Sequence, residues 1–308
     1  MRVYRSIEKP IDIKNAVITI GTFDGVHRGH QSILQHINAE AKKINGESVV
    51  ITFHPHPRLL LRPDDKSLQL ISTLDEKLDL LEKYQVQNVV VVPFTRAFST
   101  LSASEYITDF LVDKFHPKKI VIGYDHHFGN NRSGNIDMLI SHQDKFNFTV
   151  DEISKKVVDE IDVSSTKIRK SLNDGNVKQA ASLLGHEYTL EGIIKKGKQL
   201  GRTIGYPTAN INSPEELKLI PAYGVYAVKV FYKNELYKGM LNIGKRPTVD
   251  GTDMTIEVNI FDFDKDIYGE RLKVEFVDRI RNEVKFDNLD ALKNQIHLDK
   301  IQVLEIFK

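Results

Sequence analysis

The chain of 308 residues contains no cysteine. Disulfides, thiolate nucleophiles and cysteine-ligated zinc or iron–sulfur sites are therefore excluded. Long apolar runs are missing too: no segment approaches the length that spans a bilayer, and the opening MRVYRSIEKPIDI has no apolar signal-peptide core. These absences predict a protein of the reducing cytoplasm.

An excess of charge of one sign is also absent. Lysine and arginine number 43 against 42 aspartates and glutamates, which gives a formal net charge of +1. Such a balance provides no long-range field that would attract duplex nucleic acid or an anionic membrane. We expect neither as a partner, so any phosphate must be bound by local architecture.

The first half of the chain alternates strand-like and helix-like segments. Apolar, β-branched runs alternate with stretches of helical apolar spacing. This alternation predicts an α/β fold in which a parallel sheet is covered on both faces. The expected strands lie at 16–20, 48–53, 88–94 and 119–123, and the expected helices at 30–44, 73–84 and 102–115.

The second half of the chain has a different pattern of apolar residues. Two short helical segments at 161–185 are followed, after residue 186, by roughly alternating strand-length segments between Gly, Asn and Asp turns. These strands predict an antiparallel sheet or small barrel, closed by a terminal helix that Asp287 can cap. We therefore expect two domains, 1–185 (α/β) and 186–308 (all-β).

Two polar stretches follow strands of the predicted parallel sheet. GTFDGVHRGH (21–30) comes after the first strand, and GYDHHFG (123–129) comes after the fourth. Ligands of such sheets bind at the carboxyl ends of the strands, so one shared site is expected. His27 and His30 can share one face at a helix start, which suits stabilisation of a phosphate.

Two other interpretations of the histidines stay open. The stretch could be a dinucleotide-binding glycine turn with incidental histidines. Zinc is the other alternative, and a catalytic zinc site needs a third protein ligand. The candidates for that ligand are His54, His56, His126 and His127.

Hydroxyl groups gather at two further places. In VSSTKIR (163–169), Ser165 and Thr166 precede Arg169 by about one helical turn, a set that could bind a pyrophosphate or merely cap a helix. In GKQLGRTIGYPTANI (197–211), Thr208 and Asn210 place oxygen atoms on one face of an extended segment, which could bind Mg²⁺ or belong to an ordinary loop.

Two apparent P-loops are rejected. GIIKKGKQ (192–199) and GMLNIGKR (239–246) both fit Gly-x4-Gly-Lys. A P-loop needs Ser or Thr after the lysine and stands between a strand and a long helix. Here Gln199 and Arg246 follow, in antiparallel strand context.

The motifs together resemble the bacterial bifunctional riboflavin kinase/FAD synthetase family. Residues 15–183 carry, in family order, GTFDGVHRGHQ, FHPHP, FSTLSASEYI, GYDHHFG and VSSTKIR. Residues 186–305 carry GKQLGRTIGYPTANI, PAYGVYAV, GMLNIGKRPT, IEVNIFDFDKDIYG and IRNEVKF. The resemblance implies a Rossmann-like nucleotidyltransferase domain followed by a riboflavin kinase-like barrel. It implies ATP, riboflavin and FMN as substrates, with Mg²⁺.

In the first domain, the resemblance implies that FMN attacks the α-phosphorus of ATP without a protein nucleophile. His27 and His30 would touch the phosphates and act in catalysis. Gly21, Phe23 and Asp24 would also bind ATP, and Ser165, Thr166 and Arg169 would hold the pyrophosphate. Asp125 and Phe128 would belong to the flavin and nucleotide loop. That loop departs from the family pattern, because His126 replaces an aromatic residue and Asn130 and Asn131 replace frequent lysines.

In the second domain, the resemblance assigns Glu257 as the general base that accepts a proton from the ribityl hydroxyl. Composition alone would make this residue an ordinary strand glutamate. The other implied roles are Mg²⁺ binding by Thr208 and Asn210, ATP binding by Gly197, Lys198, Gly201, Arg202 and Tyr268, and flavin binding by Arg281 and Phe286.

Two alternative functions remain at this stage. The chain could retain only one active half. Because the loop around His126 is altered, the retained activity would then be riboflavin kinase. It could also be a regulatory protein that binds flavin and ATP without catalysis. Retention of Glu257 together with both histidines favours an enzyme, because binding alone requires no base.

Overall fold

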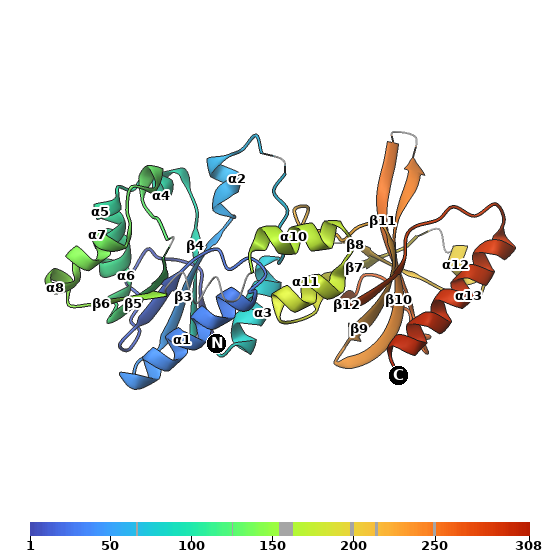
Figure 1. The fold of residues 1–308 in the computed structure, drawn as a ribbon, viewed down its shortest axis with the longest axis horizontal. Coiled ribbons are helices and arrows are strands. Elements are labelled where there is room, and N and C mark those ends of the chain that lie inside the picture. The colour runs from blue at the N-terminus through green and yellow to red at the C-terminus, as the bar shows by residue number, and fades with distance from the viewer. Residues whose placement is uncertain (66, 125, 154–162, 198–199, 213–214, 249–250) are drawn as a thin grey trace. The chain divides into compact units, whose positions relative to one another are not determined.

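The computed structural model describes residues 1–308 except 66, 125, 154–162, 198–199, 213–214 and 249–250 (Figure 1). Asp125 and Lys198, two of the expected site residues, lie outside the described residues. Contacts divide the chain into two compact units. The first comprises 1–68 and 72–164, and the second comprises 69–71 and 165–308.

The first unit is a six-stranded parallel sheet in the order β1-β4-β3-β2-β5-β6. Its strands are β1 (Arg2–Tyr4), β2 (Val17–Ile20), β3 (Ser48–His54), β4 (Asn88–Pro93), β5 (Lys119–Gly123) and β6 (Thr149–Ile153). Its helices are α1 (Arg28–Lys43), α2 (Pro57–Leu61), α3 (Leu74–Lys83), α4 (Arg96–Ser99), α5 (Ala103–Glu105), η1 (Tyr106–Val112), α6 (Asp113–Phe115), η2 (Asn130–Arg132), α7 (Ile136–Ser141) and α8 (Gln143–Phe146).

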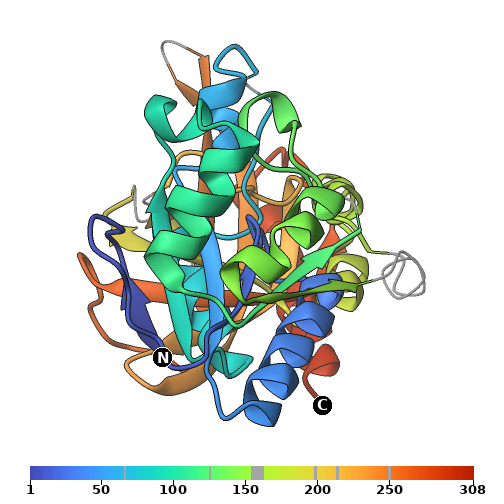
Figure 2. The same ribbon diagram turned by 90° about the vertical axis from the view of Figure 1, so that its left-hand side faces the viewer.

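Two apolar cores lie on opposite faces of this sheet, as the helices in Figure 2 indicate. Successive residues of β3 alternate between the cores: Val49 and Ile51 pack with η1, and Val50 packs with α1 and α3. Such alternation is the geometry of a strand covered on both sides. The expected α/β architecture is confirmed.

The sheet order changes direction at β2. The chain passes from β2 to β3 and β4 on one side and then returns to place β5 on the other side of β2. The stretches 21–30 and 123–129 therefore follow neighbouring parallel strands at a topological switch point. This is where open α/β sheets bind ligands.

Three details of the first unit were not expected. The edge strands β1 and β6 were missed, because β1 is short and β6, TVDEI, has no continuous apolar run. The helix expected at 102–115 contains the π-helical segment η1. Its π geometry leaves the expected apolar face buried, since Tyr106, Phe110 and Leu111 are each at most 5% exposed.

The second unit is built on a closed antiparallel barrel in the order β10-β11-β8-β7-β12-β9, which confirms the expected all-β half. Its strands are β7 (Tyr188–Lys195), β8 (Ala209–Asn212), β9 (Gly224–Tyr232), β10 (Glu235–Thr248), β11 (Gly251–Ile260) and β12 (Arg271–Arg281). The rejected P-loop GMLNIGKR lies within β10. The helices of this unit are α10 (Ser165–Asn173), α11 (Val177–Leu184), α12 (Leu200–Thr203) and α13 (Leu289–Ile306).

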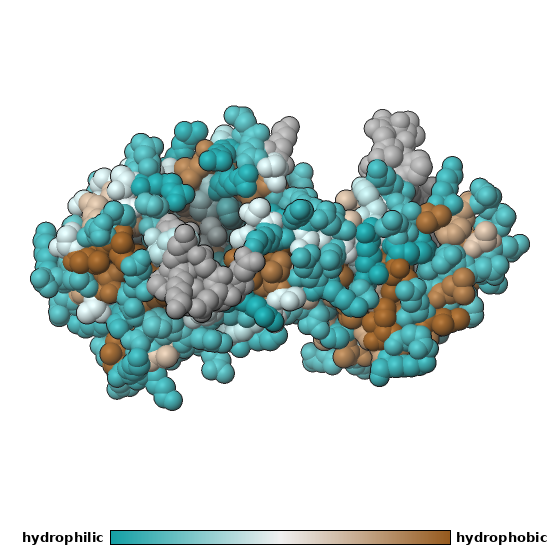
Figure 3. Space-filling model, viewed as in Figure 1, coloured by the Kyte–Doolittle hydropathy of each residue, from teal (hydrophilic) through white to brown (hydrophobic). Residues whose placement is uncertain are grey.

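Helix α13 packs one face on the barrel through Ile296 and Val303. The expected cap, Asp287, is wrong: Asn288 is the N-cap, because its side chain accepts from the Ala291 N–H at 2.8 Å. The helix leaves Leu298, Ile301 and Leu304 exposed, and apolar patches are visible on the barrel unit in Figure 3. In the described part of the chain, no helix has the length and apolar character needed to cross a membrane.

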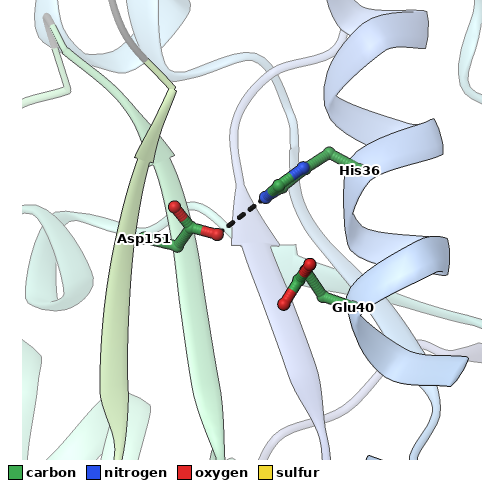
Figure 4. A group of neighbouring side chains, drawn as sticks. All are labelled: His36, Glu40 and Asp151. Carbon is green, nitrogen blue, oxygen red and sulfur yellow. Dashed lines mark hydrogen bonds and ion pairs between the residues drawn. The ribbon is translucent and has the colours of Figure 1, made fainter. Parts of the chain in front are cut away.

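A salt-bridge network joins α1 to β5 and β6 in the first unit (Figure 4). His36 Nε2 lies 2.7 Å from Asp151 Oδ2, and the buried carboxylate of Glu40 lies close to this pair. Imidazole and carboxylate groups can ligate metals. Here, however, Glu40 already binds the ammonium groups of Lys119, at 2.6 Å, and Lys43. These cations, foremost Lys119, lower the pKa of Glu40 to about 2.

The network predicts an acid-sensitive contribution to stability. Because the folded-state pKa of Glu40 is depressed from 4.5 to about 2, its contribution is complete above pH 4.5 and is lost as pH falls toward 2. We expect the free energy of unfolding to fall less between pH 5 and pH 3 in Glu40→Gln than in the unmodified protein. Urea denaturation followed by circular dichroism measures this. The exposed Glu152→Gln is the control, and an equal pH dependence in Glu40→Gln and unmodified protein would contradict the prediction.

Candidate active sites

In the first unit, the expected histidine pair lies where β2 turns into α1. His27 is the N-cap of α1, and its Nδ1 accepts a hydrogen bond from the His30 N–H at 3.4 Å. The two imidazole rings stack with centroids 3.7 Å apart. Gly29 permits this stacking, because a Cβ there would lie 3.3 Å from the His27 ring. With Nδ1 accepting, a neutral His27 carries its proton on Nε2.

His30 is held in its neutral form. Burial lowers its pKa well below the usual value, and the nearby His27 and Lys77 lower it further. Phe23, only 2% exposed, lies beside it with ring centroids 4.9 Å apart. At neutral pH the site therefore offers imidazole N–H groups and the amino end of α1 to an anion.

The loop between β2 and α1 is held in a strained conformation. Phe23 and Val26 have φ values of 47° and 39°, which are unusual for residues with a Cβ and most of all for a β-branched one. The buried carboxylate of Asp24 accepts from the Ser72 N–H at 3.1 Å, and Ser72 Oγ accepts from the Gly25 N–H at 3.0 Å. Asp24 thus fixes the loop, a role that the sequence did not reveal.

The second expected loop of this unit, 123–129, is held in place by the buried side chain of Phe128. Phe128 is 5% exposed and stacks on Tyr106 with centroids 4.9 Å apart. Its backbone pairs with Gly134 through two hydrogen bonds. The side chain of Phe128 therefore packs inside the loop and shapes it, and its membership of a flavin and nucleotide loop stays a prediction.

Ser165, Thr166 and Arg169 lie at the start of α10, in the second unit. Arg169 Nε donates to the carbonyl of Gln69 at 2.7 Å, so the guanidinium is anchored to residues 69–71 of the same unit. Thr166 is exposed and Ser165 is half-buried. Both hydroxyls are near the amino end of the helix, as the sequence predicts.

In the barrel, strand pairing brings the expected base and metal ligands together. Glu257 on β11 lies directly opposite Asn210 on β8. Thr208 Oγ1 donates to Glu257 Oε2 at 3.0 Å. Asn259, 6% exposed, donates from its side chain to the Pro207 carbonyl at 2.7 Å and so fixes the segment that carries Thr208.

Two cavities meet at Thr208. One, of about 260 Å³, is lined by Arg202, residues 263–268 and Pro207. Tyr268 is among these lining residues, as expected for a nucleotide site. Gly197 packs closely against β8, because a Cβ on it would lie 2.3 Å from the Asn210 side chain. A Cβ on Gly201 would likewise lie too close to the Tyr206 carbonyl.

The other cavity, of about 480 Å³, is lined by Glu257, Asn210, Arg281 and Phe286. The structure thus brings the expected base, metal ligands and flavin residues to one cavity wall. Helix α13 completes this wall, which the sequence did not suggest. Its lining residues are Leu292, Ile296 and Asp299.

The donor set around Thr208 fits Mg²⁺. Thr208 Oγ1, the Asn210 amide and the Glu257 carboxylate are oxygen donors, the type that this cation prefers. The Thr208 hydroxyl gives its hydrogen to Glu257, and its oxygen keeps lone pairs for a cation. Few protein ligands are required, since Mg²⁺ usually takes further oxygens from substrate phosphates and water.

Comparison with known proteins places both halves in characterised families. The FAD synthetase family matches residues 9–167, and the riboflavin kinase family matches residues 184–307. A bifunctional riboflavin kinase/FMN adenylyltransferase of Haemophilus influenzae is 40% identical over 90% of each chain. That of Escherichia coli K12 is 39% identical over 96% of this chain and 93% of the relative.

A solved structure has the same fold. The crystal structure of a macrolide-efflux protein from Streptococcus pneumoniae covers 97% of this chain with 34% identity and a TM-score of 0.84; the match covers 96% of that chain. These relatives thus match 90–97% of the chain, and the two family matches include the motifs around His27 and Thr208. The chain belongs to the bifunctional riboflavin kinase/FMN adenylyltransferase family.

Proposed function

We propose that this protein makes FAD from riboflavin in two steps. The barrel phosphorylates riboflavin with ATP to give FMN and ADP. The α/β unit then transfers AMP from a second ATP to FMN and releases pyrophosphate. The observation that carries the proposal is the meeting of two cavities at Thr208, with Glu257 hydrogen-bonded to it.

In the kinase step, ATP occupies the cavity lined by Arg202 and Tyr268, and riboflavin occupies the cavity lined by Arg281 and Phe286. Glu257 accepts the proton of the ribityl 5′-hydroxyl as that oxygen bonds to the γ-phosphorus and the bond to ADP breaks. Thr208 and Asn210 would hold Mg²⁺, which neutralises phosphate charge when bound. The Thr208 hydroxyl orients the Glu257 carboxylate.

In the adenylyl step, a phosphate oxygen of FMN attacks the α-phosphorus of ATP, and pyrophosphate leaves. The attacking phosphate is already an anion, so no base is required. His27 and His30 donate N–H groups to the negative charge that develops, and the amino end of α1 adds to this stabilisation. For Ser165, Thr166 and Arg169, at the start of α10, the role implied by the family resemblance is binding of pyrophosphate.

A binding protein without activity is less well supported. Binding of flavin and ATP would not require a carboxylate hydrogen-bonded to a hydroxyl where the two cavities meet. Loss of the adenylyl step alone is the other alternative, and it rests on the changed residues around His126. Phe128 and Gly134 keep the fold of that loop, which favours retention of both steps.

Product analysis tests the proposal directly. Incubation with riboflavin, ATP and Mg²⁺ should produce FMN first and FAD later, as separated by chromatography. Formation of FMN without FAD would mean that only the barrel is active, as a riboflavin kinase. If riboflavin and separately supplied FMN both stay unchanged, the enzyme proposal is wrong.

Replacement of His30 should affect only the second step. We expect His30→Ala to lower kcat/KM for conversion of FMN to FAD by about 10²–10³-fold, the usual cost of one preorganised donor. Riboflavin phosphorylation should stay unchanged. His116→Asn is the control, because His116 is exposed and its φ of 43° suits asparagine. Full adenylyl activity in His30→Ala would refute the assigned role.

Replacement of Glu257 should have the reverse effect. Glu257→Gln keeps the shape of the side chain but removes its basicity, so kcat for riboflavin phosphorylation should fall by about 10²–10⁴-fold. FAD formation from supplied FMN should be retained. Glu270→Gln, a surface change outside both cavities, is the control. A loss of less than threefold in Glu257→Gln would exclude general-base catalysis by this residue.

A further inference from the structure

Asp299 of α13 is a buried carboxylate with a defined set of partners. It is 2% exposed. Arg281, at the end of β12, donates to it from Nε at 2.9 Å and 3.0 Å to the two oxygens, and from Nη2 at 2.7 Å. Gln295 Nε2 donates to Asp299 Oδ1 at 2.9 Å. The contact is a two-point ion pair, which fixes the plane of the guanidinium group as well as its position.

The same guanidinium group lines the 480 Å³ cavity. Asp299, Arg281 and Phe286 all contribute to its wall. Arg281 Cζ lies 5.7 Å from the Phe286 ring centroid, and Nη1 donates to the Asn282 carbonyl at 3.0 Å. Three of the five N–H groups of Arg281 are thus used within the described residues. The other two can donate to a ligand in the cavity.

A planar cation beside an aromatic ring is suited to a flat, polar heteroaromatic ligand. Arg281 can donate to ring carbonyl oxygens, and Phe286 supplies apolar contact. Such recognition depends on the orientation of the guanidinium group, because a rotated fork no longer points its N–H groups at the ligand. The residue that determines this orientation is Asp299.

We propose that Asp299 is a positioning residue for riboflavin, which acts by holding the guanidinium plane of Arg281 against the isoalloxazine ring. This inference rests on the proposed kinase function and adds a residue of α13 to the substrate site. Asp299 differs from Glu257 in its chemistry. Its oxygens are occupied by Arg281 and Gln295, so it takes no part in proton transfer.

The proposal predicts an effect on KM and little effect on kcat. Asp299→Asn keeps the side-chain shape but turns one acceptor into an N–H donor that opposes the guanidinium N–H groups. We expect KM for riboflavin to rise at least about tenfold, the usual effect of losing one charge-assisted hydrogen bond. KM for ATP and kcat should stay within about threefold. Asp290→Asn, on the exposed first turn of the same helix, is the matched control.

A double-substitution cycle tests whether Asp299 acts through Arg281. Arg281→Lys keeps the charge but removes the planar fork, so it should raise KM for riboflavin to a similar extent. Asp299→Asn added to Arg281→Lys should then change KM by less than about threefold, because the two residues act as one unit. Independent, multiplicative effects would overturn the proposal, as would a loss of kcat at unchanged KM in Asp299→Asn.

Folding is checked by circular dichroism, and a third variant keeps the test valid if Asp299→Asn does not fold. Gln295 is not among the residues that line the cavity and its side chain donates to Asp299, so Gln295→Ala removes a contact of Asp299 without removing a side chain from the cavity wall. A rise in KM for riboflavin of about two- to fivefold at constant kcat would support the proposal, and an unchanged KM would refute it. Failure of the proposed function itself is distinct, since the unmodified protein would then not phosphorylate riboflavin.

Discussion

A polar side chain buried without a partner costs about 1–3 kcal/mol, and the loops of both candidate sites depend on avoiding that cost. In the first unit, the buried Asp24 is paired with Ser72, and this pairing holds the loop that ends at His27. In the barrel, the buried Asn259 is paired with the Pro207 carbonyl, next to Thr208. In each pair one partner lies within three residues of a proposed site residue, and the pairing fixes the backbone that carries that residue.

The two sites differ because their nucleophiles differ. A ribityl hydroxyl must lose a proton as it attacks, and the proposed base, Glu257, lies at the cavity wall of the barrel. A phosphate nucleophile is already an anion and needs no base, and a free carboxylate close to the triphosphate of ATP would repel that triphosphate. The proposed site of the α/β unit accordingly consists of imidazole groups and a helix start, and its nearby acid, Asp24, is bound to Ser72.

Apolar patterning predicted most of the fold, because a strand buried on both faces and an amphipathic helix leave different periodicities. Apolar patterning failed for strands whose residues show neither a continuous apolar run nor a regular alternation of apolar and polar residues. Strand β6 lies at the sheet edge and reads TVDEI, and the four residues of β8 show no alternation that separates them from a loop. The cap of α13 was misplaced by one residue, since Asp287 and Asn288 are both good caps and only the backbone conformation decides between them.

The site residues that the sequence predicted are those proposed to touch reactants, since their types and spacing follow from the chemistry. The residues that hold them were not visible, because a supporting contact can come from anywhere in the chain. Asp24 and Ser72 are 48 positions apart, and Arg281 and Asp299 are 18 apart. Only the fold shows that Asp299, an ordinary acidic residue of a terminal helix in the sequence, is a buried partner of an arginine in the cavity wall. A positioning role is therefore best sought among buried polar residues whose partners face a cavity.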